Sequence, residues 1–91
     1  MDKQDLLLSH LFARVKRHVE PEDHPASSSE LAQDTNLSVE YTVALCEELA
    51  REGFVVMSTL NIPPLVYITL PGIARARRMD TAFSALDRKS A

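Results

Sequence analysis

The stretch from Asn36 to Val55 (NLSVEYTVALCEELAREGFV) constrains the fold more than any other part of the chain. Ser38 can cap a helix start, because its hydroxyl accepts a backbone N–H left free in the first turn. Gly53 can end the same helix, since a left-handed residue costs least without a Cβ. Apolar and small side chains recur between these signals at three- and four-residue steps, which predicts an amphipathic helix. Its expected buried stripe is Val39, Thr42, Val43, Cys46, Leu49 and Ala50.

Two further helices are predicted on the N-terminal side of this central helix. Residues 1–19 form the first, because apolar side chains fall on one helical face. The second opens at Ser27, which has capping-box spacing to Glu30, and a left-handed residue at Asn36 would end it. The loop between these two helices contains two prolines and no periodicity. The apolar face of the first helix comprises Leu8, Leu11, Phe12, Val15 and Val19.

A strand hairpin and a last helix are predicted after Gly53. Residues 54–60 and 65–70 are rich in β-branched and aromatic side chains, as strands are, and the two prolines between them cannot donate to a ladder. Residues 71–88 are predicted to be helical, with Pro71 in the first turn. The chain is thus expected to be one α+β domain over residues 1–91, mostly α, with three helices, a two-stranded hairpin and a C-terminal helix.

The C-terminal helix carries an apolar seam that repeats at four- and three-residue steps, as in coiled coils. The expected core does not need this seam, because it is already formed by Leu11, Val15, Leu31, Leu37, Leu49, Phe54 and Ile68. Left exposed, the seam would exceed the apolar patch that a monomer usually tolerates. A homodimer is therefore expected, with an interface of Leu6, Leu7, Ala76, Met79, Phe83 and Leu86. For Leu6 and Leu7, burial at the rim of the core is the alternative.

The composition excludes several classes of protein. The single cysteine, Cys46, cannot form an internal disulfide. No apolar run approaches the ~20 residues of a membrane span, and the acidic N-terminus does not fit a secretory signal, so a cytoplasmic protein is expected. The sequence shows no nucleophile–base constellation, phosphate-binding glycine loop or metal-ligand spacing. We therefore expect no enzyme activity, no cofactor and no metal.

The charge is unevenly distributed along the chain. The formal net charge is −3, with five basic and eleven acidic residues up to Leu70, followed by five basic and two acidic residues. Duplex DNA binding normally depends on Lys and Arg that neutralise phosphates. The C-terminal segment is therefore where the positive charge for such binding is concentrated.

The order helix, short helix, helix, hairpin, helix resembles the winged-helix regulators of bacteria and archaea, a group that includes the MarR-like and ArsR-like proteins. The resemblance is carried by SSELA (28–32), NLS (36–38), LAREGFV (49–55) and YITLPGIARARR (67–78). It implies a winged helix-turn-helix with the helix-turn-helix at residues 27–53 and the wing at 54–70. The implied function is that of a DNA-binding transcriptional regulator, acting as a homodimer, whose central helix enters the major groove.

Carried over to this sequence, the resemblance implies a set of residues that contact duplex DNA. Helix N-termini can bind phosphates through free N–H groups, hydroxyl side chains can add hydrogen bonds, and arginines of the last helix can supply charge. The resulting candidates are Ser28, Ser38, Tyr41, Thr42, Leu45, Asn61, Arg75, Arg77 and Arg78.

The groove-facing side of the central helix departs from the pattern of this group. It contains no Arg, Lys, Asn or Gln, which are the usual readers of guanine and adenine, and Glu47 and Glu48 would repel phosphates. The turn of the hairpin also carries no charge. A second hypothesis is therefore a winged-helix module that binds another protein through this acidic and apolar face, without reading DNA.

Overall fold

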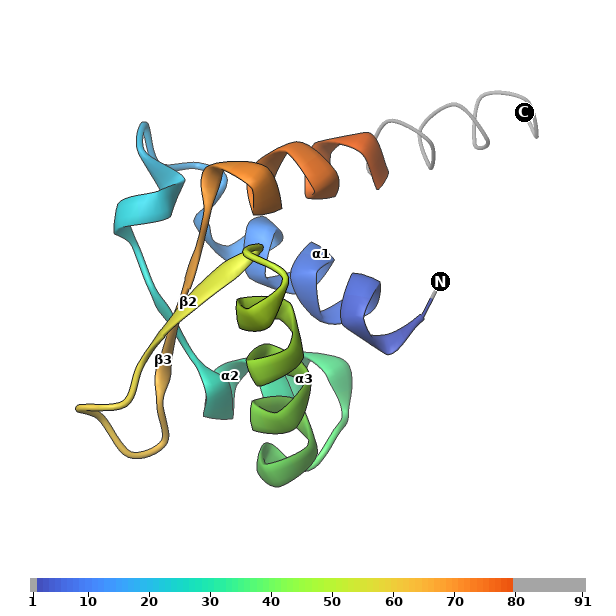
Figure 1. Cartoon of the computed structure of the whole chain (residues 1–91), viewed down its shortest axis with the longest axis vertical. Helices are drawn as coiled ribbons and strands as arrows, with labels where there is room; N and C mark the ends of the chain where they lie inside the picture. The colour runs from blue at the N-terminus through green and yellow to red at the C-terminus, as the bar shows by residue number, and fades with distance from the viewer. Residues whose placement is uncertain (1, 80–91) are drawn as a thin grey trace.

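Four helices and a small antiparallel sheet make up the computed structural model, which describes residues 2–79 (Figure 1). In chain order the elements are α1 (Lys3–Val15), the 3-10 helix η1 (Pro21–Asp23), β1 (Ala26–Ser27), α2 (Ser28–Thr35), α3 (Val39–Arg51), β2 (Val55–Ser58), β3 (Leu65–Ile68) and a C-terminal helix described over residues 70–79. The predicted fold class, mostly α with a hairpin between the third and the last helix, is confirmed.

The predicted helix boundaries around α2 and α3 are confirmed by their capping groups. Ser27 and Glu30 form a reciprocal capping box at the start of α2, and Ser38 Oγ accepts the N–H of Tyr41 at 3.1 Å at the start of α3. Asn36 ends α2 with a φ of 57°, and Gly53 follows α3 with a φ of 85°. Each of these residues meets a local requirement, either for an N–H acceptor or for left-handed backbone.

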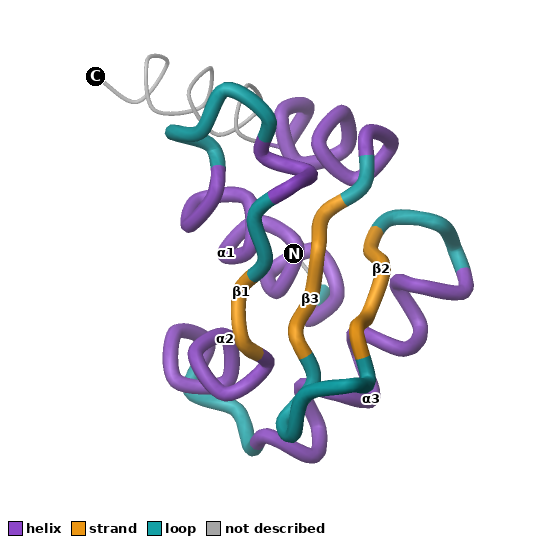
Figure 2. Tube along the Cα trace, turned by 90° about the vertical axis from the view of Figure 1, so that its left-hand side faces the viewer, coloured by secondary structure: helices purple, strands orange, loops and turns teal. Residues whose placement is uncertain are grey.

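The sheet has three strands rather than the two that were predicted. Its order is β1-β3-β2, with both pairings antiparallel (Figure 2). The added strand β1 pairs Ala26 with Val66 and Ser27 with Leu65. Because β1 consists of only two residues, it has no alternation that sequence patterns could detect.

Helix α1 is shorter than predicted, because it ends at Val15 instead of continuing to residue 19. The N–H of His18 donates to the carbonyl oxygen of Val15 at 3.1 Å, which closes a turn directly after the helix. Val19 consequently leaves the apolar face and is 99% exposed, so its predicted burial is wrong. The following prolines, one of them in η1, exclude a continuing helix.

The core lies between the sheet and the helices, with fully buried leucines from α1, α2 and α3 packed on Val66 and Ile68 of β3. Five of the seven predicted core residues are buried, and the other two, Leu37 and Phe54, are half-buried against them. The buried stripe of α3 is rotated from its predicted position. Leu45 is buried, whereas Val39 is exposed and Val43 and Ala50 are half-buried.

The C-terminal helix completes this core. Ile73 and Ala76 are buried in the same cluster as α1, and Met79 packs against it from a half-buried position. Leu7 is also buried there, while Leu6 is half-buried. The prediction that Leu7 and Ala76 would face a second subunit is therefore wrong, because the subunit's own core uses both side chains. Phe83 and Leu86 lie outside the described residues.

Candidate nucleic-acid interface

Helices α2 and α3 form a compact pair joined by a three-residue turn at Asn36–Ser38. The N–H of Leu37 donates to the carbonyl oxygen of Ala32 at 3.0 Å, which closes the end of α2. The turn between β2 and β3, which we call the hairpin tip (residues 59–64), lies at the same end of the molecule as the start of α3 (Figures 1 and 2). A duplex placed against this end would meet α3 and the hairpin tip together.

The solvent side of α3 is acidic and apolar. Glu40, Ala44, Glu47 and Arg51 recur at four-, three- and four-residue steps and are all exposed. This stripe offers carboxylate acceptors and a methyl group, with one guanidinium at the C-terminal end of the helix. The carboxylates can accept a hydrogen bond from the amino group of cytosine, but they cannot donate to guanine or adenine.

Three of the predicted DNA-contacting residues are buried instead. Thr42 and Leu45 face the core on the inner side of α3, and Ser28 is buried at the first turn of α2. The hydroxyls of Ser28 and Thr42 have no hydrogen-bond partner among the described residues. The enclosed hydroxyl of Thr42 cannot reach a phosphate, and the backbone N–H of Ser28, expected to be free, donates to the carbonyl oxygen of Pro64 at 3.0 Å. This part of the prediction is corrected.

Three other predicted residues lie on the expected surface. Ser38 and Tyr41 are exposed at the start of α3, and Asn61 is exposed in the hairpin tip. The hydroxyl of Ser38 is occupied as the helix cap, whereas the Tyr41 ring stands beside it with 45% of the residue exposed. These residues stay candidates for polar contacts to a nucleic acid.

Lys3 also belongs to this surface, although no sequence pattern indicated it. Its ammonium lies over the Tyr41 ring, 5.1 Å from the ring centroid, and the neighbouring Gln4 donates to Glu48 at 2.5 Å. These contacts bring the start of α1 against the outer flank of α3. No local sequence signal could identify Lys3, because the contact depends on how α1 packs across a helix 38 positions away.

The predicted arginines are not part of this surface. Arg75 forms an ion pair with Asp5 at 2.6 Å and lies 4.8 Å from the centroid of the Phe54 ring. The guanidinium carbon of Arg77 lies 6.0 Å from the centroid of the Phe12 ring, while Arg78 is exposed. The C-terminal helix lies at the opposite end of the molecule from the hairpin tip (Figure 1). The side chains of Arg75 and Arg77 are therefore engaged by contacts within the protein, on a helix that does not border the hairpin tip.

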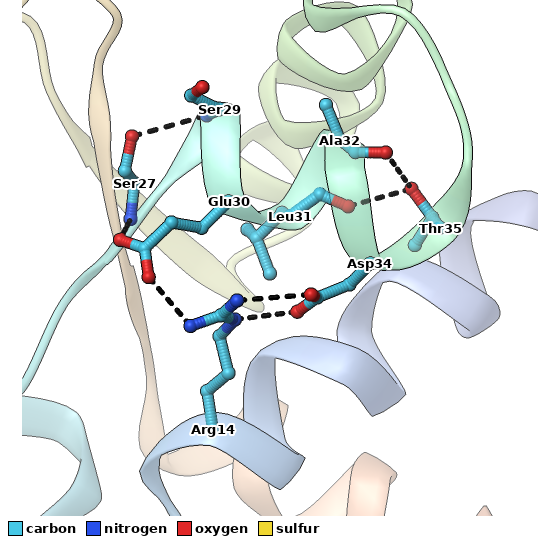
Figure 3. Close-up of polar contacts among 8 residues, drawn as sticks. All are labelled: Arg14, Ser27, Ser29, Glu30, Leu31, Ala32, Asp34 and Thr35. Atoms are coloured by element: carbon cyan, nitrogen blue, oxygen red, sulfur yellow. Dashed lines mark hydrogen bonds and ion pairs between the residues drawn. The ribbon is translucent and has the colours of Figure 1, made fainter.

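An ion-pair cluster fastens α2 to α1 (Figure 3). The guanidinium of Arg14 donates to both carboxylate oxygens of Asp34, at 2.5 and 3.0 Å, and to Glu30 at 2.6 Å. The hydrogen bond from Arg14 holds the pKa of Asp34 below its usual value. Glu30 also belongs to the capping box of α2. The same carboxylate thus sets where α2 begins and where α2 sits on α1.

Structural comparison identifies the architecture that these elements form. MepR, a transcription regulator of the Staphylococcus aureus multidrug efflux pump MepA, superposes on 98% of this chain with a TM-score of 0.76 and 13% identity. The MepR–DNA complex matches 99% of the chain at a TM-score of 0.72 and 13% identity. The chain has the winged-helix fold. In this fold the β2–β3 hairpin is the wing, and α2 and α3 are the two helices of the helix-turn-helix.

A second winged helix of similar structure is the haem sensor PefR from Streptococcus agalactiae, at a TM-score of 0.68 and 19% identity over 96% of this chain. The chain spans 62% of the length of MepR and 56% of that of PefR. Neither a protein-family model nor a curated protein sequence matches the chain. The resemblance stated from the sequence is therefore confirmed at the level of the fold.

Away from this surface, the described residues do not meet the requirements of a metal site, a membrane-spanning helix or a reactive thiol. Within residues 2–79 no three metal-binding side chains come together, and no helix is both long and apolar enough to cross a membrane. Cys46 is fully buried, and desolvation raises the pKa of its thiol to about 12. The thiol is thus protonated and acts as a small apolar side chain of the core.

Proposed function

We propose that this winged helix binds duplex DNA and acts in transcription regulation. The observation that supports this function best is the match of nearly the whole chain to a regulator seen in complex with DNA. In such an arrangement α3 would enter the major groove and the wing would lie beside it. Because the recognition helix carries few donors, affinity would depend mainly on contacts to the DNA backbone and on DNA shape.

The start of α3 supplies the groups for backbone contacts. Its first turn has N–H groups that no helical carbonyl accepts, and the helix dipole favours an anion there. The Tyr41 hydroxyl can donate to a phosphate, and the ammonium of Lys3 is held beside the same ring. This is where we place the principal phosphate contact of the protein.

Fluorescence anisotropy with a labelled random duplex at several salt concentrations tests this function. The protein should bind at low salt, and the affinity should fall as salt rises because counterions are released from phosphates. Lys3→Gln should weaken binding and flatten the salt dependence. Lys16→Gln, an exposed lysine directly after the other end of α1, serves as the matched control and should leave both quantities unchanged. Absence of any binding by the unmodified protein at low salt would overturn the proposal.

A protein-binding module is the second candidate, and the acidity of α3 favours it. Glu40, in the first turn of α3, and Glu47 both lie on the exposed face, where they would repel phosphates and attract a basic partner. Glu48 is less suitable for a test, because it is half-buried and bound by Gln4. The face would then act on another protein while the winged-helix scaffold is retained.

Replacing Glu40 and Glu47 with Gln separates these two candidates. If α3 meets DNA, the double variant should bind duplex more tightly than the unmodified protein, and the gain should shrink as salt screens the charges. Glu20→Gln with Asp23→Asn, two exposed acids at the start and end of η1, is the control for net charge. If binding is undetectable in every variant, the protein-binding module is the better description.

A further inference from the structure

The wing is free of charge over an unusually long stretch. Residues 53–74 contain no Asp, Glu, Lys, Arg or His. Within this stretch, Leu60 and Ile62 of the hairpin tip are 95% and 98% exposed. Two large aliphatic side chains are thus presented to solvent at the end of a projecting hairpin, where the core gains nothing from them.

The hairpin that carries these side chains is fastened on both sides. Strands β2 and β3 pair from Val55↔Ile68 to Ser58↔Leu65, up to the residues that border the tip. On the other edge, the N–H of Ser28 donates to the carbonyl oxygen of Pro64 at 3.0 Å, which ties the tip to the start of α2. These bonds hold both ends of the tip, so that its apolar side chains project from a fixed base.

An uncharged tip cannot contribute to DNA binding by neutralising phosphates. It can contribute by a different mechanism, in which apolar side chains enter the minor groove and partly unstack a base step. The geometry permits this contact, because major and minor grooves alternate along a duplex and the tip projects beside the start of α3. Leucine, isoleucine and proline are among the residues that act as such wedges, and the sequence of the tip is TLNIPP.

We propose that Leu60 and Ile62 form an apolar wedge that enters the minor groove and kinks the duplex. Asn61, which is exposed between them, would hydrogen-bond to base edges in the same groove. The preferred sites would contain pyrimidine–purine steps, which unstack most easily. This inference rests on the proposed DNA-binding function and adds how the wing would engage the duplex.

The test uses two readouts on one short duplex of alternating T·A steps. End-to-end energy transfer between terminal dyes reports bending, and 2-aminopurine in place of adenine reports unstacking. The unmodified protein should raise both signals in proportion to binding. Leu60→Ser with Ile62→Ser should abolish both rises and weaken binding by about tenfold or more, because two buried side chains are lost from the complex. Val19→Ser is the matched control, since Val19 is 99% exposed and belongs to the loop after α1.

The other possible outcomes distinguish failure of the wedge from failure of the DNA-binding function. If the unmodified protein binds the duplex without bending or unstacking it, or if the tip variant retains both signals, the wedge is wrong and the DNA-binding function stands. If the unmodified protein does not bind the duplex at all, both proposals fall. If the tip variant changes only the sedimentation of the free protein, the tip is a contact between protein chains, and the wedge is wrong.

Discussion

Gly72 lies directly against the carbonyl group of Phe54, so that a Cβ at this position would overlap the Phe54 oxygen and approach Ile68 Cγ1 to 2.9 Å. The same junction is bridged by Thr69, whose hydroxyl accepts the N–H of Gly72 at 3.1 Å and donates to the carbonyl oxygen of Gly53 at 2.6 Å. The start of the C-terminal helix is thus packed onto the turn between α3 and β2.

Gly72→Ala should destabilise the protein by about 1–3 kcal/mol, because backbone and a core side chain must move to admit one methyl group. The free energy of unfolding from urea denaturation, followed by circular dichroism, measures this. Ala74→Ser, on the exposed face of the same helix, should change stability by less than about 0.5 kcal/mol. An unchanged stability of Gly72→Ala would show that the helix does not pack this closely on the turn.

Thr42→Val should leave stability unchanged or raise it by about 1 kcal/mol. The Thr42 hydroxyl is buried without a partner among the described residues, and valine removes that polar group while keeping the branched shape. Thr35→Val is the matched control, because the Thr35 hydroxyl donates to the carbonyl oxygen of Leu31 at 2.7 Å, and its loss should be destabilising. If Thr42→Val weakens DNA binding without reducing stability, the buried position of Thr42 is wrong.

The ion pair between Arg14 and Asp34 should make stability fall in acid. The folded-state pKa of Asp34 is depressed, so its contribution is present above the unfolded pKa of about 3.9 and is lost as pH falls through the folded pKa. The loss should be at most about 1 kcal/mol, because both side chains are partly exposed and solvent screens the pair.

Urea midpoints between neutral pH and pH ~3 measure this contribution. Asp34→Asn should lower the midpoint near neutrality and flatten its fall in acid. Glu22→Gln, which alters a carboxylate outside the Arg14 cluster, should leave the decrease of the urea midpoint at low pH the same as in the unmodified protein. If the urea midpoint of Asp34→Asn changed with pH in parallel with that of the unmodified protein from neutral pH to pH ~3, Asp34 would not be coupled to Arg14.

The homodimer predicted from the apolar seam stays a prediction. Its remaining candidates are Leu6 and Met79, which are half-buried, together with Phe83 and Leu86, which continue the spacing of the seam. Light scattering should report a dimer, and Phe83→Glu should shift the protein to monomer because a carboxylate cannot be buried unpaired. Ser84→Glu, adjacent in sequence but outside the seam, should leave the mass unchanged. A monomeric mass of the unmodified protein at high concentration would contradict the expectation.

The elements that were predictable from sequence are those determined by local chemistry. Ser38 had to supply an acceptor at a helix start, and Asn36 and Gly53 had to take left-handed backbone, so their positions follow from neighbouring residues alone. Strand β1 was missed because its pairing partner Val66 lies 40 positions further along the chain. The facing of Leu45 was missed because a small rotation of α3 moves a residue from the flank of the buried stripe into it.

The candidate interface was predictable only in part, for the same reason. Tyr41 and Asn61 lie where the helix and hairpin patterns put them, on exposed positions. The place of Arg75 could not be inferred, since its partner Asp5 is 70 positions away. The excess of positive charge after Leu70 predicted a DNA-binding role for the C-terminal arginines. Their location in the molecule depends instead on how the C-terminal helix packs against α1.

Strand β1 is the short piece of chain that joins the wing to α2. Ser27 pairs with Leu65 at the end of the wing and is at the same time the cap of α2. The wing and the first turn of α2 thus share Ser27, so a molecule that separated β1 from β3 would break the pairing of Ser27 with Leu65 directly beside the cap of α2. Such a molecule would act on the junction between the wing and α2 without touching α3.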